Sequence, residues 1–489
     1  MGGSVFISAV GASAPTLRVS AGAIGTAWGR KGGRAISAVC APDEDTLTLA
    51  ASAAVRALSA AAIEPSTVDG LWWGCTRPPF AEGPSHAVLS AALGLSPHAG
   101  GALMSGSPHS GIEALLGAAD AIAAGSARVA VAVVSDALIP GLGTPFEARC
   151  GAGAAAVVLT AADGPAVLTV RVTRSHPLLD RYRGDGEQHT RDLYDPRLFR
   201  EEMFLPSVRE VADHLAALEV RAWSLPDPDG RLGAAIGAAV GATTVPSAQV
   251  YAALGDTAAA AALLGAVGAF DTIGPVAIVG TGGGRTTGLV VEVNQPVPGA
   301  AVVAHDLASD SRDATYAEVL RARGQLAPSG EMIPMGVPPE SALFARGAAE
   351  MLQLLGGRCA DCGTINTPPS IHPTCIACGC PKLEPVPLAR HGVVHTFVIN
   401  QTMPAPFVAP LPIAVVDLED GARVMLQVVG DGKDLAIGSE VDLVLRRYAH
   451  ERGVPVYGYK SKLRARPDAD LGEALSRPAA GASEQPRNA

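Results

Sequence analysis

The sequence predicts an α/β fold with two similar halves, followed by a zinc ribbon and a small OB-type β-barrel. Three observations lead to this prediction. Helical patterns alternate with fully apolar strand patterns over residues 1–295, two Cys-x-x-Cys knuckles follow, and short strands separated by Gly, Asp and Pro complete the chain. Apolar strands that alternate with helices indicate a sheet covered by helices on both faces. Short strands with regular turns are typical of a small barrel.

The composition favours a large globular protein and excludes several classes. The chain has 489 residues, 48% of them hydrophobic and 4% aromatic, and a formal net charge of −10. This length predicts about two to four domains. No basic stripe with interleaved aromatic residues suggests nucleic-acid binding. No apolar run reaches the roughly 18 residues that a membrane-spanning helix needs. We therefore expect neither a nucleic-acid nor a membrane partner.

The first half of the α/β region is predicted over residues 1–165. Its clearest helix, 45–62, has apolar residues on one face, and Asp43 or Asp45 is suited to cap its start. A second helix is rich in alanine and leads directly into an apolar strand. The predicted strands are 5–10, 68–73, 129–134 and 152–159, and the predicted helices are 45–62 and 111–124.

The second half repeats this alternation more loosely, which predicts a pseudo-duplicated domain over 1–295. Residues 178–200 are charged and rich in Arg, Asp and Gly, so we expect them to leave the second half as an exposed excursion. The predicted strands are 167–172, 276–279 and 287–293, and the predicted helices are 206–218, 233–241 and 257–266.

The rest of the chain divides into four segments. Residues 296–345 carry prolines and few apolar runs, which predicts a linker that wraps the first domain. A helix at 344–355 and the knuckles form a helix and zinc ribbon over 346–384. The barrel follows over 385–466, and the polar tail 467–489 is predicted to be disordered. The predicted barrel strands are 392–400, 413–418, 423–429, 440–447 and 455–460.

The two knuckles predict one structural zinc site. Four thiolates at this spacing can surround a tetrahedral Zn²⁺ and leave no position for water. The competing interpretation is four free or disulfide-bonded cysteines. Cys380 is an alternative ligand whose spacing fits less well. Because the N-terminus lacks a charged secretory signal and thiols stay reduced in the cytoplasm, we expect a cytoplasmic protein. The predicted ligands are Cys359, Cys362, Cys375 and Cys378.

The C-terminal segment, about 346–466, resembles the zinc-ribbon/OB-fold family that accompanies acyl-CoA thiolases and synthases. The resemblance rests on Arg358-Cys359-Ala-Asp-Cys362-Gly363, on Gly392-x-Val394-x-Thr396 and on Ile437-Gly438-Ser-Glu-Val. It implies a domain without chemistry of its own, which stabilises a partner thiolase and helps to accommodate acyl-CoA.

The N-terminal 295 residues resemble the thiolase superfamily, especially 3-hydroxy-3-methylglutaryl-CoA synthases and ketoacyl-ACP synthase III. Three stretches carry the resemblance: Ser110-Gly111-Ile-Glu-Ala-Leu before Ser135-Asp136, the glycine-rich run 280–288, and the segment that begins at Gly74. It implies a thiolase-like fold, a homodimer and an acyl-CoA substrate. The glycine run lacks the Gly-Lys-Ser/Thr ending of a phosphate loop, so we expect it to serve close backbone packing.

The residues of this family that carry the chemistry are absent from the matching positions. The acyl-accepting cysteine at the start of the central helix is replaced by Pro108 if positions are counted from the end of the helix. It is replaced by His109 if they are counted from Ser110-Gly111. A thiolate there would be activated by the helix N-terminus. The glutamate, histidine and asparagine of the family correspond to Thr76, Pro226 and Asp256. The resemblance therefore implies a catalytically degenerate domain.

Other residues could replace the missing thiol. Cys75 and Cys150 lie near the expected pocket, although buried cysteines more often serve as small apolar residues. Ser107 or Ser110 could act with His109 as a base. A basic cluster after the barrel could contact CoA phosphates or form a solvated charged face; its members are Lys460, Lys462, Arg464 and Arg466.

The sequence thus predicts an accessory subunit of an acyl-CoA thiolase or acyltransferase complex. Its barrel would dock on a partner thiolase, and the partner's cysteine would hold the acyl group. The alternative is a self-sufficient acyltransferase or synthase with a non-standard nucleophile. Structural zinc and a coenzyme A thioester are the expected cofactor and ligand.

Overall fold

The N-terminal domain is built on one mixed sheet that divides into two halves. The computed structural model describes residues 3–177, 179–191, 195–326, 347–403, 407–451 and 454–464. β1 pairs along its length with β7 but with β8 only at Phe6 and Ile7, so the halves separate there. In the described residues the strand order is β5 (Gly100–Met104), β4 (Gly70–Gly74), β6 (Val129–Ala137), β7 (Ala152–Thr160), β1 (Phe6–Ser13), β8 (Ala166–Ser175), β11 (Arg285–Val293), β10 (Gly274–Gly282) and β9 (Ala222–Ser224).

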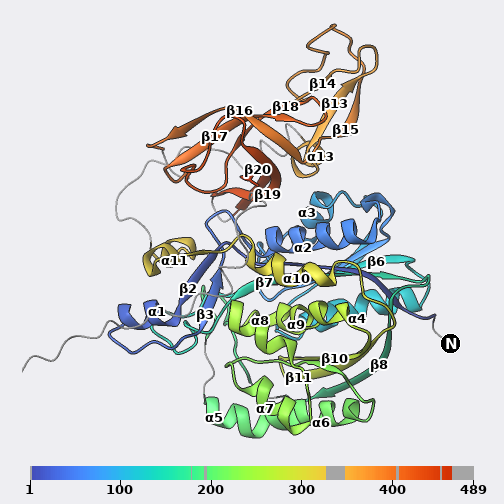
Figure 1. The fold of residues 1–489 in the computed structure, drawn as a ribbon, viewed down its shortest axis with the longest axis vertical. Helices are drawn as coiled ribbons and strands as arrows, with labels where there is room; N and C mark the ends of the chain where they lie inside the picture. Colours follow the sequence, from blue (N-terminus) through green and yellow to red (C-terminus); the bar gives the residue numbers. More distant parts are fainter. Residues whose placement is uncertain are drawn as a thin grey trace, which may run out of the picture.

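Helices lie between the two halves and on both outer faces, which gives five layers (Figure 1). The central core joins Val10 and Val134 of the first half to Ile278 of the second through Ile112 and Leu263 of the helices between them. This arrangement confirms the predicted pseudo-duplicated, thiolase-like α/β fold. The central helices are α4 (Ser110–Ala123) and α9 (Ala261–Val267); α2 (Thr46–Ala61) and α3 (Ser85–Ala92) cover the first half, and α6 (Leu205–Ala216) and α7 (Leu232–Ala239) the second.

The start of α2 is determined by local sequence. The Asp45 side chain accepts hydrogen bonds from the backbone N–H groups of Leu47 and Thr48, and the Thr48 hydroxyl oxygen accepts one from the Asp45 N–H. This reciprocal capping box satisfies donors that a helix end leaves free. A Cβ at Gly11 of β1 would lie 2.4 Å from the carbonyl oxygen of Ala53, so the close contact of α2 with the sheet requires glycine there.

Several short elements were not predicted, because each has too few residues for a clear periodicity. A small sheet has the order β12 (Arg312–Asp313), β2 (Leu17–Ser20) and β3 (Ile36–Val39). The edge strands β5 and β9 were also missed. The predicted linker contains helices in its described part, and its residues 327–345 lie outside the described residues. The additional helices are α1 (Ala21–Ala27), α3, α5 (Pro196–Leu198), α8 (Pro246–Leu254), α10 (Val303–Ala308) and α11 (Tyr316–Ala322).

The C-terminal part forms a ribbon and a barrel, as predicted. The ribbon sheet has the order β14 (Ile365–Asn366), β13 (Leu355–Cys359) and β15 (Leu383–Pro387), preceded by α13 (Ala348–Leu352). The N–H of Val429 donates to the carbonyl of Ser461 at 2.8 Å and brings the two edges of the barrel together. The tail 467–489 lies outside the described residues. The barrel strands run in the order β18 (Arg423–Gln427), β17 (Leu411–Leu418), β16 (His391–Asn400), β19 (Glu440–Glu451) and β20 (Val454–Leu463).

The barrel packs against the N-terminal domain of its own chain, on the side of α2 (Figure 1). Leu47 and Leu58 of α2 belong to the same buried core as Leu445 and Tyr457 of the barrel. The Tyr457 hydroxyl donates to an Asp45 carboxylate oxygen at 2.7 Å, so the residue that caps α2 also holds the barrel. The two domains therefore share one apolar interface.

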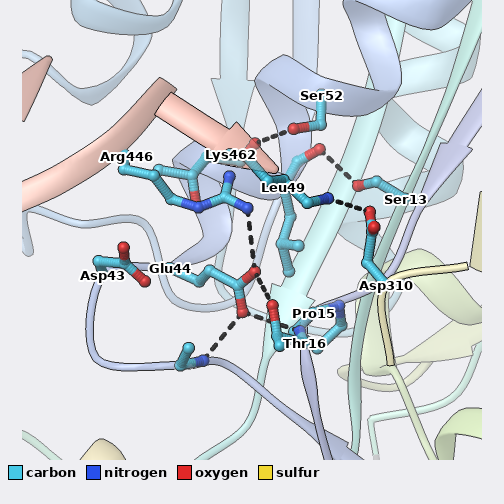
Figure 2. A network of polar contacts seen from close by, with 12 residues as sticks. Ser13, Pro15, Thr16, Asp43, Glu44, Leu49, Ser52, Asp310, Arg446 and Lys462 are labelled. Atoms are coloured by element: carbon cyan, nitrogen blue, oxygen red, sulfur yellow. Dashed lines mark hydrogen bonds and ion pairs between the residues drawn. The ribbon is translucent and has the colours of Figure 1, made fainter. Parts of the chain in front are cut away.

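Ion pairs surround this interface, and Glu44 lies at their centre (Figure 2). One Glu44 oxygen accepts from the Arg446 guanidinium at 3.3 Å and from the Thr16 hydroxyl at 2.7 Å. The other accepts the N–H groups of Thr16 and Ala41, both at 2.9 Å. Glu44 and Arg446 are 4% and 7% exposed, so the ion pair is almost completely shielded from solvent.

The predicted basic cluster after the barrel pairs with carboxylates of the chain itself. Lys460 Nζ lies 3.0 Å from an oxygen of Asp43, and Lys462 pairs with Asp310. Arg464 contacts Asp442 at 3.0 Å. Both lysines therefore form ion pairs at the domain interface rather than a solvated face. Arg466 lies outside the described residues. None of the helices in the described ranges has the length and apolarity to cross a membrane.

Candidate functional site

A cavity of about 230 Å³ opens at the N-terminus of the central helix α4. It lies where β4, β9 and β10 end, so side chains distant in sequence meet there. Of the five positions predicted from the resemblance, four line the cavity, and His109 does not. The four are Thr76, Pro108, Pro226 and Asp256.

Pro108 lines the cavity next to the N-terminus of α4. It directly precedes His109, the first residue before α4. A Cβ added at Gly282 would lie 2.7 Å from Pro108 Cδ, and Gly283, with φ +58°, passes equally close to Ser107. The glycine run thus serves close backbone packing against this loop, as predicted. Proline offers neither a thiol nor an N–H to the cavity.

His109 turns away from the cavity and is 1% exposed. Its Nε2 lies 2.9 Å from the Thr287 hydroxyl, and its Nδ1 lies 3.2 Å from a carboxylate oxygen of Glu113. Burial lowers the pKa of His109, and Glu113 opposes that shift. Nε2 thus has a partner in Thr287 and Nδ1 faces the Glu113 carboxylate, and no hydrogen bond joins His109 to Ser107 or Ser110 among the described residues. Ser107 lines the cavity, whereas Ser110 is fully buried.

Thr76 is held by a buried carboxylate. Its hydroxyl donates to one oxygen of Asp136 at 2.8 Å, and the N–H groups of Thr76 and Ala259 point to the other oxygen, both at 3.2 Å. Burial raises the pKa of Asp136 to about 6, while these hydrogen bonds act in the opposite direction. Asp136 therefore fixes the cavity wall and has few lone pairs left for a ligand.

Asp256 is neutralised by an arginine from the 178–200 excursion. Arg181 Nη1 donates to Asp256 Oδ2 at 2.8 Å, and the guanidinium lies 4.0 Å above the ring of Phe146. Burial raises the pKa of Asp256, and Arg181 counteracts this effect. The excursion is therefore a wall of the cavity. The charge of residues 178–200 is evident in the sequence. Their position at the cavity is not, because the contact of Arg181 with Asp256 spans 75 residues.

The two cysteines that could replace the missing thiol are buried in the protein interior. Cys75 and Cys150 are both 0% exposed, and neither lines the cavity. Burial raises the pKa of both thiols. A thiol that stays protonated is a poor nucleophile. Both side chains belong to apolar cores, as expected for structural cysteines.

An exposed cationic loop at residues 28–34 was not predicted from the sequence. Arg30, Lys31 and Arg34 are all exposed, and Trp28 before them is 43% exposed. The indole Nε1 of Trp28 donates to Glu147 at 3.1 Å, next to the cavity residue Phe146. The dense local charge in residues 28–34 was the available signal, and the fold joins Trp28 of this loop to Glu147.

The cysteine knuckles form a compact candidate metal centre in the ribbon. Cys359, Cys362, Cys375 and Cys378 bring their Sγ atoms within 4.8 Å of one another and could hold a metal ion. The two knuckles share one geometry: the N–H of Gly363 donates to Cys359 and that of Gly379 to Cys375, at 3.0 and 2.8 Å. Both glycines have positive φ, which favours glycine over other residues.

Cys380 does not join this group. It is 8% exposed, and its sulfur accepts the N–H of Lys382 at 3.4 Å. Cys380 was considered as an alternative metal ligand. The four knuckle cysteines come together without it, so it is not needed to complete the group.

Comparisons with known proteins match the two parts of the chain separately. A domain family described as "ChsH2, C-terminal OB-fold domain" matches residues 385–446. A "DUF35 domain-containing scaffold protein" of Methanothermobacter thermautotrophicus is 37% identical over 115 residues, which are 22% of this chain and 85% of that protein. A hydroxymethylglutaryl-CoA synthase of Pyrococcus horikoshii is 33% identical over 156 residues, 32% of this chain. The chain spans 45% of the length of that synthase.

Solved structures match the N-terminal domain over most of their length. The structure "MvaS in complex with 3-hydroxy-3-methylglutaryl coenzyme A" has a TM-score of 0.56 at 21% identity and covers 69% of this chain and 96% of its own. The 3-oxoacyl-(acyl carrier protein) synthase III of Pseudomonas aeruginosa has a TM-score of 0.52, also at 21% identity, and covers 60% and 98%. These likenesses show a shared fold.

Proposed function

Since this chain belongs to the DUF35 domain-containing scaffold proteins by its C-terminal part and carries a synthase-like domain of the thiolase fold, we propose that it is an accessory subunit of an acyl-CoA thiolase or acyltransferase complex. A partner thiolase would supply the cysteine that holds the acyl group. This chain would supply the scaffold, a second acyl-CoA pocket and the surface on which the partner docks.

One observation carries the proposal: the cavity lies at the N-terminus of the central helix α4 but has no nucleophilic thiol in its described lining. Pro108 stands at the N-terminus of α4, and the cavity is lined by no cysteine among the described residues. Covalent acyl transfer in this fold requires a thiolate at that helix end. The catalytic degeneracy inferred from Thr76, Pro226 and Asp256 agrees with this, because none of them can replace a thiol.

The cationic loop 28–34 supports binding of coenzyme A. Diphosphate and phosphate groups are bound in proteins by clustered Arg and Lys side chains. Arg30, Lys31 and Arg34 are exposed in the loop that follows Trp28, and Trp28 bonds to Glu147, the neighbour of the cavity residue Phe146. A coenzyme A thioester would extend from this loop toward the cavity. Trp28 adds an aromatic surface next to these charges.

The ribbon would bind zinc, and its role would be structural. Thiolates are ligands that Zn²⁺ prefers, and four of them leave no position for a reacting water. A reducing cytoplasm, where we place the protein, would keep the thiolates free of disulfide bonds. The metal would hold the ribbon rigidly beside the barrel.

The barrel would present its outer surface to the partner thiolase, while β19 and β20 contact the N-terminal domain of the same chain. Val398 of β16 and Met425 of β18 are 53% and 73% exposed. A homodimer of the synthase-like domain would form at the sheet edge, where β5 has no second neighbour among the described strands. Gly100 and Gly101 of that edge are exposed, which would permit a second copy to approach closely.

Incubation of the purified full-length chain with acetyl-CoA and longer acyl-CoAs should leave its intact mass unchanged. The reason is that no described cavity residue offers an acyl-accepting thiol. Intact-mass spectrometry after desalting measures the result. A stable acyl adduct would contradict the proposal and favour a self-sufficient acyltransferase, and mapping the adduct would name the nucleophile.

Co-expression with a thiolase encoded beside this chain should yield a co-purifying complex. Met425→Asp, which places a charge on the exposed apolar surface of the barrel, should weaken that complex at least tenfold in affinity. The control is Leu218→Asp, which places a charge on an exposed apolar residue of the N-terminal domain, just after α6, where the side chain is 41% exposed. Equal effects of the two variants, or no complex with the unmodified chain, would contradict docking through the barrel.

A further inference from the structure

The cavity at the start of α4 is much richer in aromatic side chains than the chain as a whole. Aromatic residues make up 4% of the sequence, which contains nine phenylalanines. Three of these phenylalanines line the cavity, together with one tyrosine. Aromatic side chains gathered at one pocket indicate a ligand with an apolar part. The four aromatic lining residues are Phe146, Tyr182, Phe199 and Phe204.

Two of these rings lie next to each other at a π-helical turn, Phe199–Phe204, which leads into α6. Hydrogen bonds of a π-helix join residues five positions apart, and such turns are frequent at functional sites. The ring centroids are 5.6 Å apart, and the ring planes are inclined by 43°. Phe204 is 2% exposed and belongs to the apolar core of the second half, whereas Phe199 is half-buried. Phe204 is therefore a fixed wall, and Phe199 leaves part of its ring accessible.

The carboxylates of the cavity lining have partners within the protein. Asp256 accepts from Arg181 at 2.8 Å, and Asp180 accepts the N–H of Gly283, also at 2.8 Å. The third, Asp227, receives hydrogen bonds from backbone N–H groups of residues 229–233. These acidic groups consequently do not need a polar ligand in the cavity to satisfy them.

Three prolines make another part of the wall apolar and rigid. Pro108, Pro226 and Pro228 all line the cavity, and proline has no backbone N–H to donate. Phe146 is fully buried, and the Arg181 guanidinium lies 4.0 Å above its ring, so this side chain is also fixed in place. Such walls favour a ligand that fills the space with carbon rather than one that forms hydrogen bonds.

We infer that the cavity selects a coenzyme A thioester whose acyl group carries a carbon ring, such as phenylacetyl-CoA, over acetyl-CoA. The inference rests on the proposed function, which brings an acyl-CoA to this cavity. A cavity of about 150 Å³ lined by Leu, Ile and Phe already holds benzene. The volume here is about 230 Å³, so a ring fits with room for the carbons that join it to the thioester. Rings gain additional stabilisation when they pack offset or edge-to-face on aromatic side chains.

Calorimetric titration of the full-length chain with acetyl-CoA, octanoyl-CoA and phenylacetyl-CoA tests this selectivity. We expect phenylacetyl-CoA to bind about tenfold more tightly than acetyl-CoA, because the ring is buried against aromatic side chains. It should also bind more tightly than octanoyl-CoA, which has the same number of acyl carbons but no ring. Phe199→Leu keeps an apolar side chain and removes the ring face. This change should weaken phenylacetyl-CoA about fivefold and leave acetyl-CoA unaffected.

A matched control and the comparison of ligands separate the outcomes. Phe397→Leu alters a half-buried phenylalanine of β16 that does not line the cavity, so it should leave all three affinities unchanged. The ligand series on the unmodified chain does not depend on the folding of any variant. Absence of binding by all three thioesters would overturn the proposed function itself. If they bind, equal affinities for acetyl-CoA and phenylacetyl-CoA, or octanoyl-CoA binding as tightly as phenylacetyl-CoA, would overturn only the selection of a ring.

Discussion

Replacing Cys359 by serine should abolish zinc binding by the four-cysteine site and unfold the ribbon. The side chain is 2% exposed, and its sulfur lies 3.5 Å from that of Cys378 within the group of four. Structural zinc contributes on the order of 10 kcal/mol to the folding of small sites of this kind. The ribbon sheet has few other buried groups to compensate, because its own small core consists mainly of cysteines. Metal content by atomic absorption and calorimetric melting measure the two effects.

Cys380→Ser is the matched control for this experiment. Cys380 is a cysteine of the same ribbon and is also buried, but it lies outside the group of four. Its replacement should keep one zinc per chain and change the melting curve little. Retention of zinc with an unchanged melting curve in Cys359→Ser would refute the ribbon assignment. Loss of zinc from Cys380→Ser as well would show that the fifth cysteine is a ligand.

Replacing Glu44 by alanine should destabilise the joined domains by about 3–5 kcal/mol, the usual effect of removing one partner from a buried ion pair. The Arg446 guanidinium would remain buried without its counter-charge, and the N–H groups of Thr16 and Ala41 would lose their acceptor. Urea unfolding followed by tryptophan fluorescence measures the change, since all four tryptophans lie in the N-terminal domain.

Two comparisons separate this effect from a general loss of charge. Asp120→Ala removes an exposed pair with Arg171, and such pairs contribute only about 0.2–1 kcal/mol. The double variant Glu44→Gln with Arg446→Met should recover much of the stability, because it leaves no buried charge unpaired. If Glu44→Ala costs no more than Asp120→Ala, the interface is held by its apolar contacts alone.

The barrel packs against the N-terminal domain of its own chain, which the sequence did not predict. The sequence predicts a barrel that docks on a partner thiolase and gives no sign that the barrel also packs on its own chain. Instead, Lys460 and Arg446 meet Asp43 and Glu44 of the same chain. The partner would therefore meet a composite surface of barrel and synthase-like domain rather than a mobile adaptor. Because this contact is intramolecular, its formation does not depend on the concentration of the protein.

Long regular elements were predictable because their patterns repeat within one segment. The helix at 45–62 corresponds to α2, and its cap at Asp45 was readable from local residues. The apolar strand at 152–159 corresponds to β7, which is buried throughout. Short elements such as β2 and β9 were missed, since three or four residues carry no periodicity and depend on neighbours far along the chain.

The sequence by itself determined the metal knuckles, the two-part organisation and the absence of a cysteine at the start of α4, because each is a matter of residue identity and local spacing. Only the tertiary structure decided that Pro108 rather than His109 lines the cavity and that Arg181 pairs with Asp256. Those facts depend on which way a side chain points and on contacts between distant segments. Local sequence does not encode either, since burial and pairing arise only when the two halves of the sheet close around the central helices.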